Sequence, residues 1–402
     1  MFDLVIVGGG MVGATLACAL ADSNLQVAIV EGNAQILGGE FGNDGRSSSI
    51  SWCSVQLWQR LGVWAGMVQR GVSPIRQIRV TDGDYPLAVC LDSREMQTEA
   101  LGYVVENTVS QPAIWAKINH SPNIKPIWGQ LVGVETLPDH LTAEIKVPDR
   151  NETYKIPTKL LVGADGAKSL VRQLAELPSR QKFYDQVCLV LKIKLGNSHR
   201  QVAYEWFQPS GPFALLPLTG ERMGVVWTVP LGQAREFLAL PLGEFLGRLE
   251  QKLGGELLAQ FGRISLACQR LWHYQPQWQY SYQYCKERLV LVGDAAHTTS
   301  PVAGQGFNLG IRDAYTLAQV LKQAIAQGED IGNLRVLKRY QRQRYWDNLA
   351  TISTTDATNL LFSNQVWLWQ GVRRTGLHLL HNVLPLRQGL MFLGMGKHYF
   401  SA

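Results

Sequence analysis

The chain has 402 residues, of which 46% are hydrophobic and 17% charged, with a formal net charge of +6. This length and composition predict a globular protein with a large core and about two domains. Lys and Arg are scattered along the chain, which argues against nucleic-acid binding and favours an anionic cofactor or an anionic membrane surface. The six cysteines form no CxxC pair, so neither a metal cluster nor a disulfide framework is expected, and a cytoplasmic location is favoured.

The first 31 residues predict a βαβ unit. A strand is expected over residues 2–7, a helix over about 12–22 and a second strand over 26–30. The apolar start is not interpreted as a signal peptide or membrane anchor, because it has no basic leading region and carries Asp3. No other run is apolar enough to predict a transmembrane helix.

Glycines and an acid stand at fixed places in this unit. Gly8, Gly10 and Gly13 follow the GxGxxG frame, which provides a tight turn, close backbone approach to a pyrophosphate and close packing of helix on strand. Glu31 ends the second strand, where a carboxylate accepts hydrogen bonds from ribose hydroxyls. The unit therefore predicts a dinucleotide site, with FAD and NAD both possible and NADP disfavoured by the charge of Glu31.

A loop with a basic residue follows. Residues 32–43 are glycine-rich and are expected to cover the cofactor, and residues 47–64 are expected to form a helix. Arg46 lies between these segments. Two interpretations of Arg46 stay open, a contact with a pyrophosphate and a solvated surface arginine.

Two later segments repeat the pattern of a buried strand that leads into a loop of small residues. The strand at 159–162 is followed by Asp165, which is expected either to contact a ribose, to pin the loop or to cap the next helix. The strand at 289–292 is followed by Asp294 and then by a long helix from about Gly306. Two helix N-termini far apart in sequence suit one long ligand with two ends.

The region from 183 to 229 alternates apolar and polar residues and is rich in Val, Trp, Tyr and Phe. This pattern predicts an antiparallel sheet with one packed face, a suitable wall for a substrate pocket.

Together these motifs resemble the class A flavin-dependent aromatic hydroxylases, and in particular the ubiquinone-biosynthesis branch of the 2-octaprenyl-6-methoxyphenol hydroxylase type. The resemblance covers residues 2 to about 362. It rests on the GxGxxG unit with Glu31, on Gly163-Ala164-Asp165-Gly166, and on Gly293-Asp294-Ala295-Ala296-His297 with Pro301, Gly304-Gln305-Gly306 and Asn308.

The resemblance implies an FAD site, and its residues carry over one by one. Those implied to bind FAD are Gly8, Gly10, Gly13, Glu31, Arg46, Asn107, Asp165, Asp294, Gly304, Gly306, Phe307 and Asn308. Pro301, Phe307 and Asn308 belong to the loop implied to position the flavin. No catalytic base and no metal ligand is assigned, and His297 is expected to have a structural hydrogen-bonding role rather than to act as a base.

The same resemblance implies the activity. It is a monooxygenase reaction on the aromatic ring of a prenylated quinone precursor, with O2 and a flavin hydroperoxide. NAD(P)H is the expected reductant, although a partner protein remains an alternative electron donor. Other quinone-biosynthesis proteins are possible partners. The competing functions are a non-catalytic or accessory flavoprotein of a quinone-biosynthetic complex and a hydroxylase of another phenolic compound.

The C-terminal region after residue 358 alternates Leu and Trp with Arg and His. Two interpretations stay open. The region either lies on a membrane surface, which makes the protein peripheral on the inner membrane, or covers the flavin domain as packed helices.

The expected fold is α/β: a Rossmann-like FAD-binding domain, an inserted antiparallel-sheet substrate domain and a C-terminal helical tail. The FAD-binding domain is expected to comprise 1–70, 101–175 and 285–350, the substrate domain 71–100 and 176–284, and the helical region 351–402.

Overall fold

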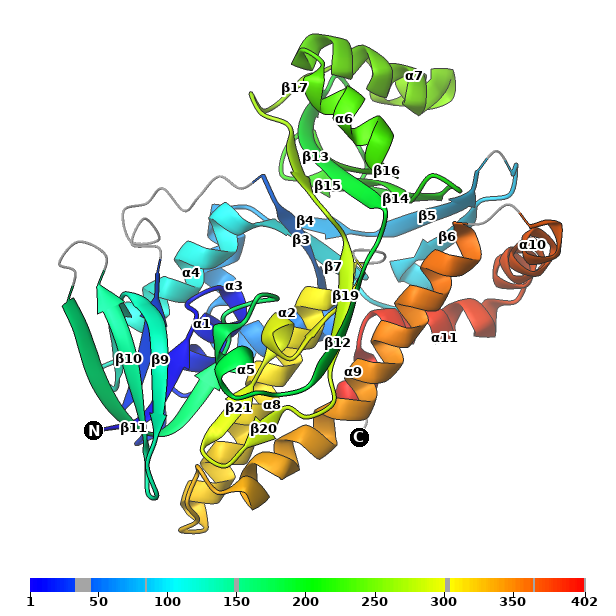
Figure 1. The fold of residues 1–402 in the computed structure, drawn as a ribbon. Helices are drawn as coiled ribbons and strands as arrows, with labels where there is room; N and C mark the ends of the chain where they lie inside the picture. Colours follow the sequence, from blue (N-terminus) through cyan, green and yellow to red (C-terminus); the bar gives the residue numbers. More distant parts are fainter. Residues whose placement is uncertain (33–44, 84, 148–151, 301–303, 364–365, 401–402) are drawn as a thin grey trace.

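The computed structural model describes residues 1–32, 45–83, 85–147, 152–300, 304–363 and 366–400. The fold is α/β, as predicted: a mostly parallel sheet with helices packed on it, a mainly antiparallel sheet beside it, and helices at the C-terminus (Figure 1).

The mostly parallel sheet contains the predicted βαβ unit, β1 (Phe2–Val7), α1 (Met11–Ala19) and β2 (Val27–Glu31). Its strand order is β20-β21-β11-β1-β2-β8, with β9 and β10 continuing from β11. The other bounds are β8 Ile124–Trp128, β9 Gln130–Thr136, β10 Leu141–Val147, β11 Glu152–Gly163, β20 Cys285–Lys286 and β21 Leu289–Leu291.

The register of this sheet brings the ends of three distant strands together. Val7 pairs with Gly163 in parallel β1 and β11, and Gly163 pairs with Leu291 in parallel β11 and β21. The loops that begin at Gly8, Ala164 and Val292 therefore leave the same edge of the sheet. In open α/β sheets, ligands bind outside this carboxyl edge.

Helices pack on this sheet. Buried apolar side chains of α1 and α8 (Gly306–Ala326) belong to one core with β1, β2, β11 and β21. The remaining helices near this core are α2 Trp52–Arg60, α3 Trp64–Arg70, α4 Asn107–Asn119, α5 Leu170–Leu174 and α9 Leu334–Phe362, with the short 3-10 turn η3 at Gly293–Ala295.

The second large sheet has the order β17-β13-β16-β15-β14-β5-β6, with β18 beside β13. Helices α6 (Leu231–Ala239) and α7 (Leu242–Phe261) cover one of its faces with a separate apolar core (Figure 1). The strands are β5 Gln77–Asp82, β6 Val89–Asp92, β13 Gln186–Leu195, β14 Val202–Phe207, β15 Phe213–Leu218, β16 Arg222–Pro230, β17 Ile264–Leu266 and β18 Trp272–Tyr274.

Two three-stranded sheets join these parts. One has the order β3-β7-β4 and the other β12-β19-β22. Their bounds are β3 Ser47–Ser51, β4 Ser73–Ile75, β7 Gly102–Glu106, β12 Ser179–Phe183, β19 Gln277–Ser281 and β22 His297–Thr298. The division into FAD-binding, substrate and C-terminal units is consistent with these sheets, and we keep its boundaries as a proposal.

The helix predicted over residues 47–64 is wrong at its start. Residues 47–51 form β3, which pairs with β7, and the helix begins only at Trp52. Ser51 explains the boundary, because its hydroxyl accepts a hydrogen bond from the Ser54 backbone N–H and caps α2.

The C-terminal region is helical, as predicted, with α10 (Trp367–Asn382), α11 (Leu384–Gly394) and the short 3-10 turn η5 (Lys397–Phe400). Its inner face packs on the β5–β6 hairpin and on α9, where Leu377 and Met391 are buried with Phe207 and Phe362. No helix among the described residues is long and apolar enough to cross a membrane.

Candidate functional site

The glycines of the first loop have different steric surroundings. A Cβ on Gly8 would lie 2.3 Å from the carbonyl oxygen of Ala164, and one on Gly13 would lie 2.0 Å from the carbonyl oxygen of Gly8. Both positions therefore exclude any side chain. A Cβ on Gly10 would meet no protein atom within 4 Å. The chain thus packs tightly around Gly8 and Gly13 and leaves space at Gly10, the start of α1.

Glu31 ends β2 beside this loop. Its Oε2 accepts a hydrogen bond of 2.8 Å from the Gly9 backbone N–H, and the Trp115 indole Nε1–H donates to the Gly9 carbonyl at 3.0 Å. These bonds fix the turn from α4 on one side and from β2 on the other. The carboxylate consequently stands at the edge of the sheet beside the N-terminus of α1.

Asp294 and Arg46 lie far apart in the sequence but at the same carboxyl edge of the sheet. Both side chains are exposed. Desolvation by the surrounding protein nevertheless raises the pKa of the Asp294 carboxyl group, against the opposing attraction of His297 and Arg46. Asn107 follows β7, and its backbone N–H donates to the Arg46 carbonyl at 3.2 Å. The structure thus brings Arg46, Asn107 and Asp294 near one another.

Asp165 has a defined local role. Its carboxylate accepts hydrogen bonds from the Ser169 hydroxyl at 2.5 Å, the Leu170 N–H at 2.7 Å and the Val171 N–H at 3.1 Å. Of the three interpretations of this residue, these bonds support pinning of the loop and capping of α5. Any contact with a ribose would be additional to them.

The loop before α8 is held against β3 by one side chain. The Asn308 Oδ1 accepts from the Ser51 N–H and the Ser54 hydroxyl, both at 2.8 Å, and its Nδ2 donates to the carbonyls of Ser49 and Gly304 at 2.9 and 3.0 Å. Asn308 is buried. The Asn308 amide thus accepts two hydrogen bonds and donates two, all within the protein. Asn308 therefore fixes the direction in which the first N–H groups of α8 point.

Close packing also shapes this loop. A Cβ on Gly304 would lie 3.0 Å from the Cβ of Ser49, and one on Gly306 would lie 2.9 Å from a methyl carbon of Thr299. The Phe307 ring packs on Trp58 with 5.8 Å between ring centroids. Pro301 lies outside the described residues.

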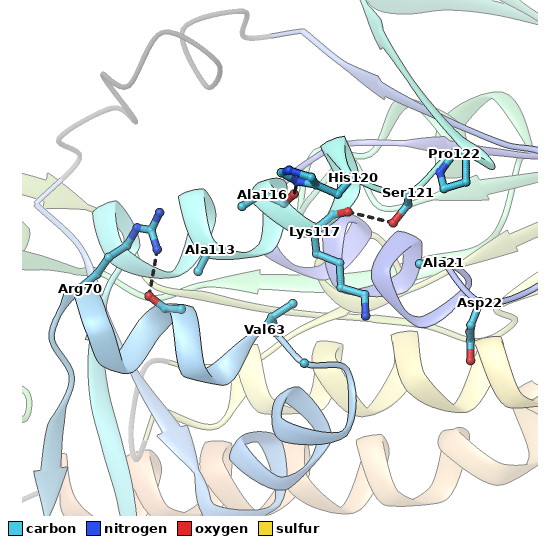
Figure 2. Close-up of a pocket in the computed structure, with 12 residues that line it drawn as sticks. Ala21, Asp22, Val63, Arg70, Ala113, Ala116, Lys117, His120, Ser121 and Pro122 are labelled. Atoms are coloured by element: carbon cyan, nitrogen blue, oxygen red, sulfur yellow. Dashed lines mark hydrogen bonds between the residues drawn. The ribbon is translucent and has the colours of Figure 1, made fainter.

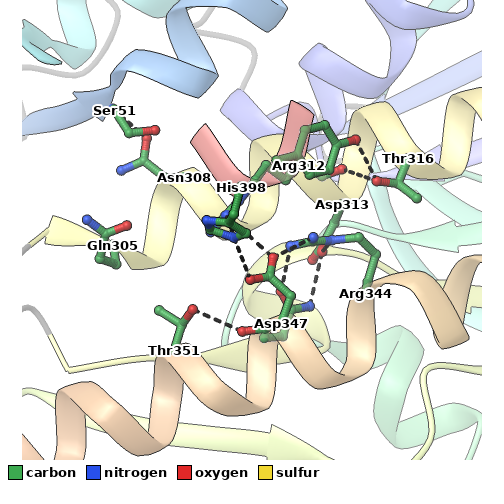
Figure 3. A network of polar contacts seen from close by, with 12 residues as sticks. Ser51, Gln305, Asn308, Arg312, Asp313, Thr316, Arg344, Asp347, Thr351 and His398 are labelled. Atoms are coloured by element: carbon green, nitrogen blue, oxygen red, sulfur yellow. Dashed lines mark hydrogen bonds and ion pairs between the residues drawn. The ribbon is translucent and has the colours of Figure 1, made fainter. Parts of the chain in front are cut away.

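A buried charged network supports the loop from below (Figure 3). Asp313 accepts from the Arg344 Nε at 2.8 Å and lies 2.5 Å from the Nε2 of His297, and Arg344 also pairs with Asp347 at 2.6 Å. Burial alone would raise the pKa of Asp313, but His297 and Arg344 outweigh it and hold this pKa well below its usual range. His297 therefore has the structural hydrogen-bonding role expected of it.

The C-terminal turn η5 contributes His398 to this network. His398 Nε2 lies 3.1 Å from Asp347 Oδ1 and 3.2 Å from Arg312 Nη1 (Figure 3), and the Gln305 side chain donates to the Gly394 carbonyl at 3.3 Å. Sequence reasoning missed Arg312, Arg344, Asp347 and His398. Arg344 and Asp347 stand in a helix that is rich in charged and polar residues, so the sequence did not single them out.

A surface cavity of about 510 Å³ lies elsewhere (Figure 2). It is lined by Asp22, Val63, Ala113 and Lys117, at the end of α1 remote from the glycine loop. The Lys117 ammonium already donates to the Leu61 carbonyl at 2.7 Å. This cavity therefore contributes nothing to the site at the sheet edge.

Three strand ends, two helix N-termini and a tight glycine turn are together the features of a dinucleotide-binding fold. Residues 1–346 match the family model described as FAD binding domain. The chain is 36% identical over 395 residues to the ubiquinone hydroxylase UbiL of Rhodospirillum rubrum, covering 98% of this chain and 89% of that protein. It is 32% identical to the 3-demethoxyubiquinol 3-hydroxylase of Escherichia coli, covering 93% of each chain.

Solved structures show the same fold. The p-nitrophenol 4-monooxygenase PnpA of Pseudomonas putida superposes with a TM-score of 0.80 at 18% identity, covering 98% of both chains. The chain belongs to the FAD-binding family of flavin-dependent aromatic hydroxylases, in the branch of the ubiquinone hydroxylases. It is an FAD-dependent monooxygenase. The residues fit the cofactor, because the open space at Gly10 and the exposed Asp294 and Arg46 lie along one sheet edge.

Proposed function

We propose that this monooxygenase hydroxylates the aromatic ring of a prenylated phenol or quinone precursor of the ubiquinone type. The observation that carries the proposal is the 36% identity to a ubiquinone hydroxylase over 98% of the chain. The hydrogen bonds by which Asn308 joins Gly304 and the start of α8 to β3 support a catalytic flavoprotein over an accessory one, because a protein that only assembles others has no need of that geometry.

The positions of the predicted FAD-binding residues support an assignment for each of them. The N–H groups around Gly10 would bind the pyrophosphate, and Arg46 would add a positive charge to it. Glu31 would bind the adenosine ribose and Asp294 the ribityl chain. Asn107, which lies beside Arg46, would contact FAD as well, and Asp165 holds the loop after β11.

The loop from Gly304 to Asn308 would present the N–H groups of α8 to the flavin pyrimidine. Those groups stabilise negative charge on the reduced ring. When bound, reduced FAD activates O2 and supplies one oxygen atom to an electron-rich aromatic ring. The protein contributes orientation of the substrate and exclusion of water. NAD(P)H is the proposed reductant, and it docks transiently because the sequence has one GxGxxG unit.

We further propose that the outer face of α10 and α11 contacts a membrane surface, so that the protein is cytoplasmic and peripheral on the inner membrane. A prenylated substrate partitions into lipid, which makes access from the bilayer useful. The large apolar side chains exposed on α10, on α11 and at the residue before α10 are Val366, Trp367, Leu368, Trp369, Val372, Leu379, Leu384, Leu386, Leu390 and Leu393.

The basic residues of the tail contribute less to this contact than the sequence suggests. Arg373 is buried and pairs with Asp82 at 2.7 Å, and Arg387 pairs with Glu95 at 2.6 Å. Both charges are therefore used within the protein. Apolar burial and tryptophan anchoring would provide most of the affinity, and binding is expected to depend only weakly on anionic lipid.

The activity is tested with purified, FAD-loaded protein and a phenol that carries three isoprene units. We expect the phenol to accelerate NAD(P)H oxidation and to be converted to a product with one additional ring hydroxyl group. Tight FAD binding with NAD(P)H oxidation unaffected by any prenylated phenol would favour the accessory flavoprotein, and turnover of unprenylated phenols alone would favour a hydroxylase of another compound.

A further inference from the structure

One carboxylic acid stands among apolar residues on the second large sheet. The residue is Glu205 on β14. Strand pairing places it in a row that crosses the sheet on one face, because directly paired residues point to the same side. In order across the sheet this row is Val89, Val80, Glu205, Ala214, Val226, Val190 and Trp272.

This face is the one opposite the helical cover. The neighbours of Glu205 along β14, Tyr204 and Trp206, point the other way and belong to the apolar core under α6 and α7. Glu205 therefore points away from that core. A carboxyl group in such a row is expensive to bury without a partner, so its presence requires a reason.

Contacts on both sides of Glu205 show what this face covers. Ala203, two residues before it, packs with Ile75 and Val104 of the β3-β7-β4 sheet. Phe207, two residues after it, packs against Phe362 of α9 in a tilted arrangement with 4.2 Å between ring centroids. Glu205 thus faces the region between the β3-β7-β4 sheet and α9.

Thr299 and Gly304, which precede α8, lie in the same region. Gly304 approaches Ser49 of β3, and the Thr299 hydroxyl bonds to that of Thr355 on α9 at 2.6 Å. At the end of the Glu205 row, the Trp272 ring packs against the backbone of Gly45, the residue before Arg46. The row is therefore bounded by the residues that we assign to the flavin site.

The carboxyl group of Glu205 has no hydrogen-bond or ion-pair partner among the described residues, and it remains partly accessible to solvent. Burial raises its pKa to about 8. The other ionisable groups on this face lie one row away or more, and those near it are engaged or neutral. They are Cys188 and Tyr274, whose pKa values are raised by burial, and the pairs Asp82–Arg373 and Lys192–Glu106.

Resting on the proposed function, we infer that Glu205 binds the substrate hydroxyl and accepts its proton, which makes it a catalytic residue of the hydroxylation. As the pH rises through the Glu205 pKa of about 8, this carboxyl group becomes ionised. The phenol O–H bond then breaks and its proton moves to the Glu205 carboxylate. The resulting phenolate is the more electron-rich ring. With O2 activated by reduced FAD, the ring carbon would gain a C–O bond as the O–O bond derived from O2 breaks. The ring hydrogen would leave as a proton, and the second oxygen atom would leave as water. NAD(P)H would supply the two electrons, and Glu205 would return its proton to the phenolate oxygen of the product.

The test compares the wild type with Glu205→Gln and Glu205→Asp in FAD-loaded protein, using the three-isoprene phenol. Glu236→Gln is the matched control, since Glu236 is exposed on α6 over the opposite face. Readouts are product formed per flavin reoxidised, its pH dependence, and the ultraviolet difference spectrum of bound phenolate. FAD content and reduction by NAD(P)H in the absence of phenol report on the integrity of each variant.

We expect Glu205→Gln to keep its FAD and its basal reduction and to lose product yield by on the order of 100-fold. It should also lose the phenolate spectrum and the pH dependence of the wild type, with both partly restored in Glu205→Asp. Wild-type yield and phenolate spectrum in Glu205→Gln would overturn the inference while leaving the proposed function intact. A wild type that hydroxylates no prenylated phenol would instead overturn the proposed function.

Discussion

The Nε2 of His297 lies 2.5 Å from the Oδ2 of Asp313, and both side chains are fully inaccessible to solvent. The pair joins the loop after β21 to helix α8, and the Gly293 N–H donates to the same carboxylate at 3.1 Å. Asp313 therefore holds the strand end that bears Asp294 in position relative to the helix that bears the flavin loop. In the FAD site that we propose, Asp313 would position two cofactor-binding segments without contacting the cofactor itself.

Asp313→Asn should destabilise the fold strongly, because it leaves Arg344 buried with one of its partners uncharged. Loss of one member of a buried ion pair typically costs about 3–5 kcal/mol. Urea unfolding followed by circular dichroism measures the change. The exposed Asp139→Asn is the control and should unfold like the wild type. An unchanged midpoint for Asp313→Asn would contradict a supporting role for this network.

Acid should weaken the protein through the same network. The pKa of Asp347, like that of Asp313, is lowered in the folded state, because His398, Arg312 and Arg344 outweigh the effect of burial. A lowered pKa stabilises the folded state above the unfolded value of about 3.9, and this contribution is lost as the pH falls through the folded value. Unfolding free energy should decline below about pH 4, and Asp347→Asn should flatten the decline. If the unfolding free energies of the wild type and Asp347→Asn declined equally with falling pH, Asp347 would not contribute to this acid sensitivity.

The glycines of the first loop should separate folding from cofactor binding. Gly13→Ala places a methyl group 2.0 Å from a backbone carbonyl and should reduce the yield of folded protein. Gly10→Ala meets no protein atom within 4 Å, so the chain should fold but lose FAD. Gly247→Ala, which is equally open on α7, is the control. Full FAD occupancy in folded Gly10→Ala would refute the placement of the pyrophosphate.

Asp294→Ala should weaken FAD retention. A hydrogen bond to a charged group contributes about 1.5–3 kcal/mol, which corresponds to roughly 10-fold to 100-fold in affinity. Flavin absorbance after gel filtration measures retention, with Asp22→Ala at the far end of α1 as the control. A folded Asp294→Ala protein that elutes fully yellow would remove Asp294 from the ribityl site.

The outer face of α10 and α11 should determine membrane binding. The double substitution of Trp367 and Trp369 by Ala should abolish sedimentation with phosphatidylcholine vesicles, while Trp346→Ala should not. Trp346 is a matched control because it is 71% exposed on α9, away from this face. Equal sedimentation of both variants would show that this face does not contact lipid. Release by salt alone would assign the binding to charge rather than to apolar contact.

The site motifs were predictable because each is local. The GxGxxG turn and Glu31 lie within one βαβ unit, so their spacing predicts their geometry. The wrong helix over 47–51 has a tertiary cause: these residues pair with β7, which appears in the sequence only 50 residues later. Pairing between distant strands overrides a local helical pattern.

Residues that act through tertiary packing were not predictable in the same way. Arg344 and His398 come from helices that meet α8 only in the folded chain. The alternation along β14 shows that Glu205 and Tyr204 face opposite sides, but which face covers the flavin loop depends on the contacts of Ala203 and Phe207.

The central claim is that this enzyme transfers an oxygen atom from O2 to the ring of a prenylated phenol. A single turnover under heavy-isotope dioxygen, with NAD(P)H and the three-isoprene phenol, tests it by mass spectrometry. The account predicts a product heavier by one labelled oxygen atom, in an amount that follows the FAD content of the protein. Unlabelled product, or oxidation of NAD(P)H with release of hydrogen peroxide alone, would contradict it.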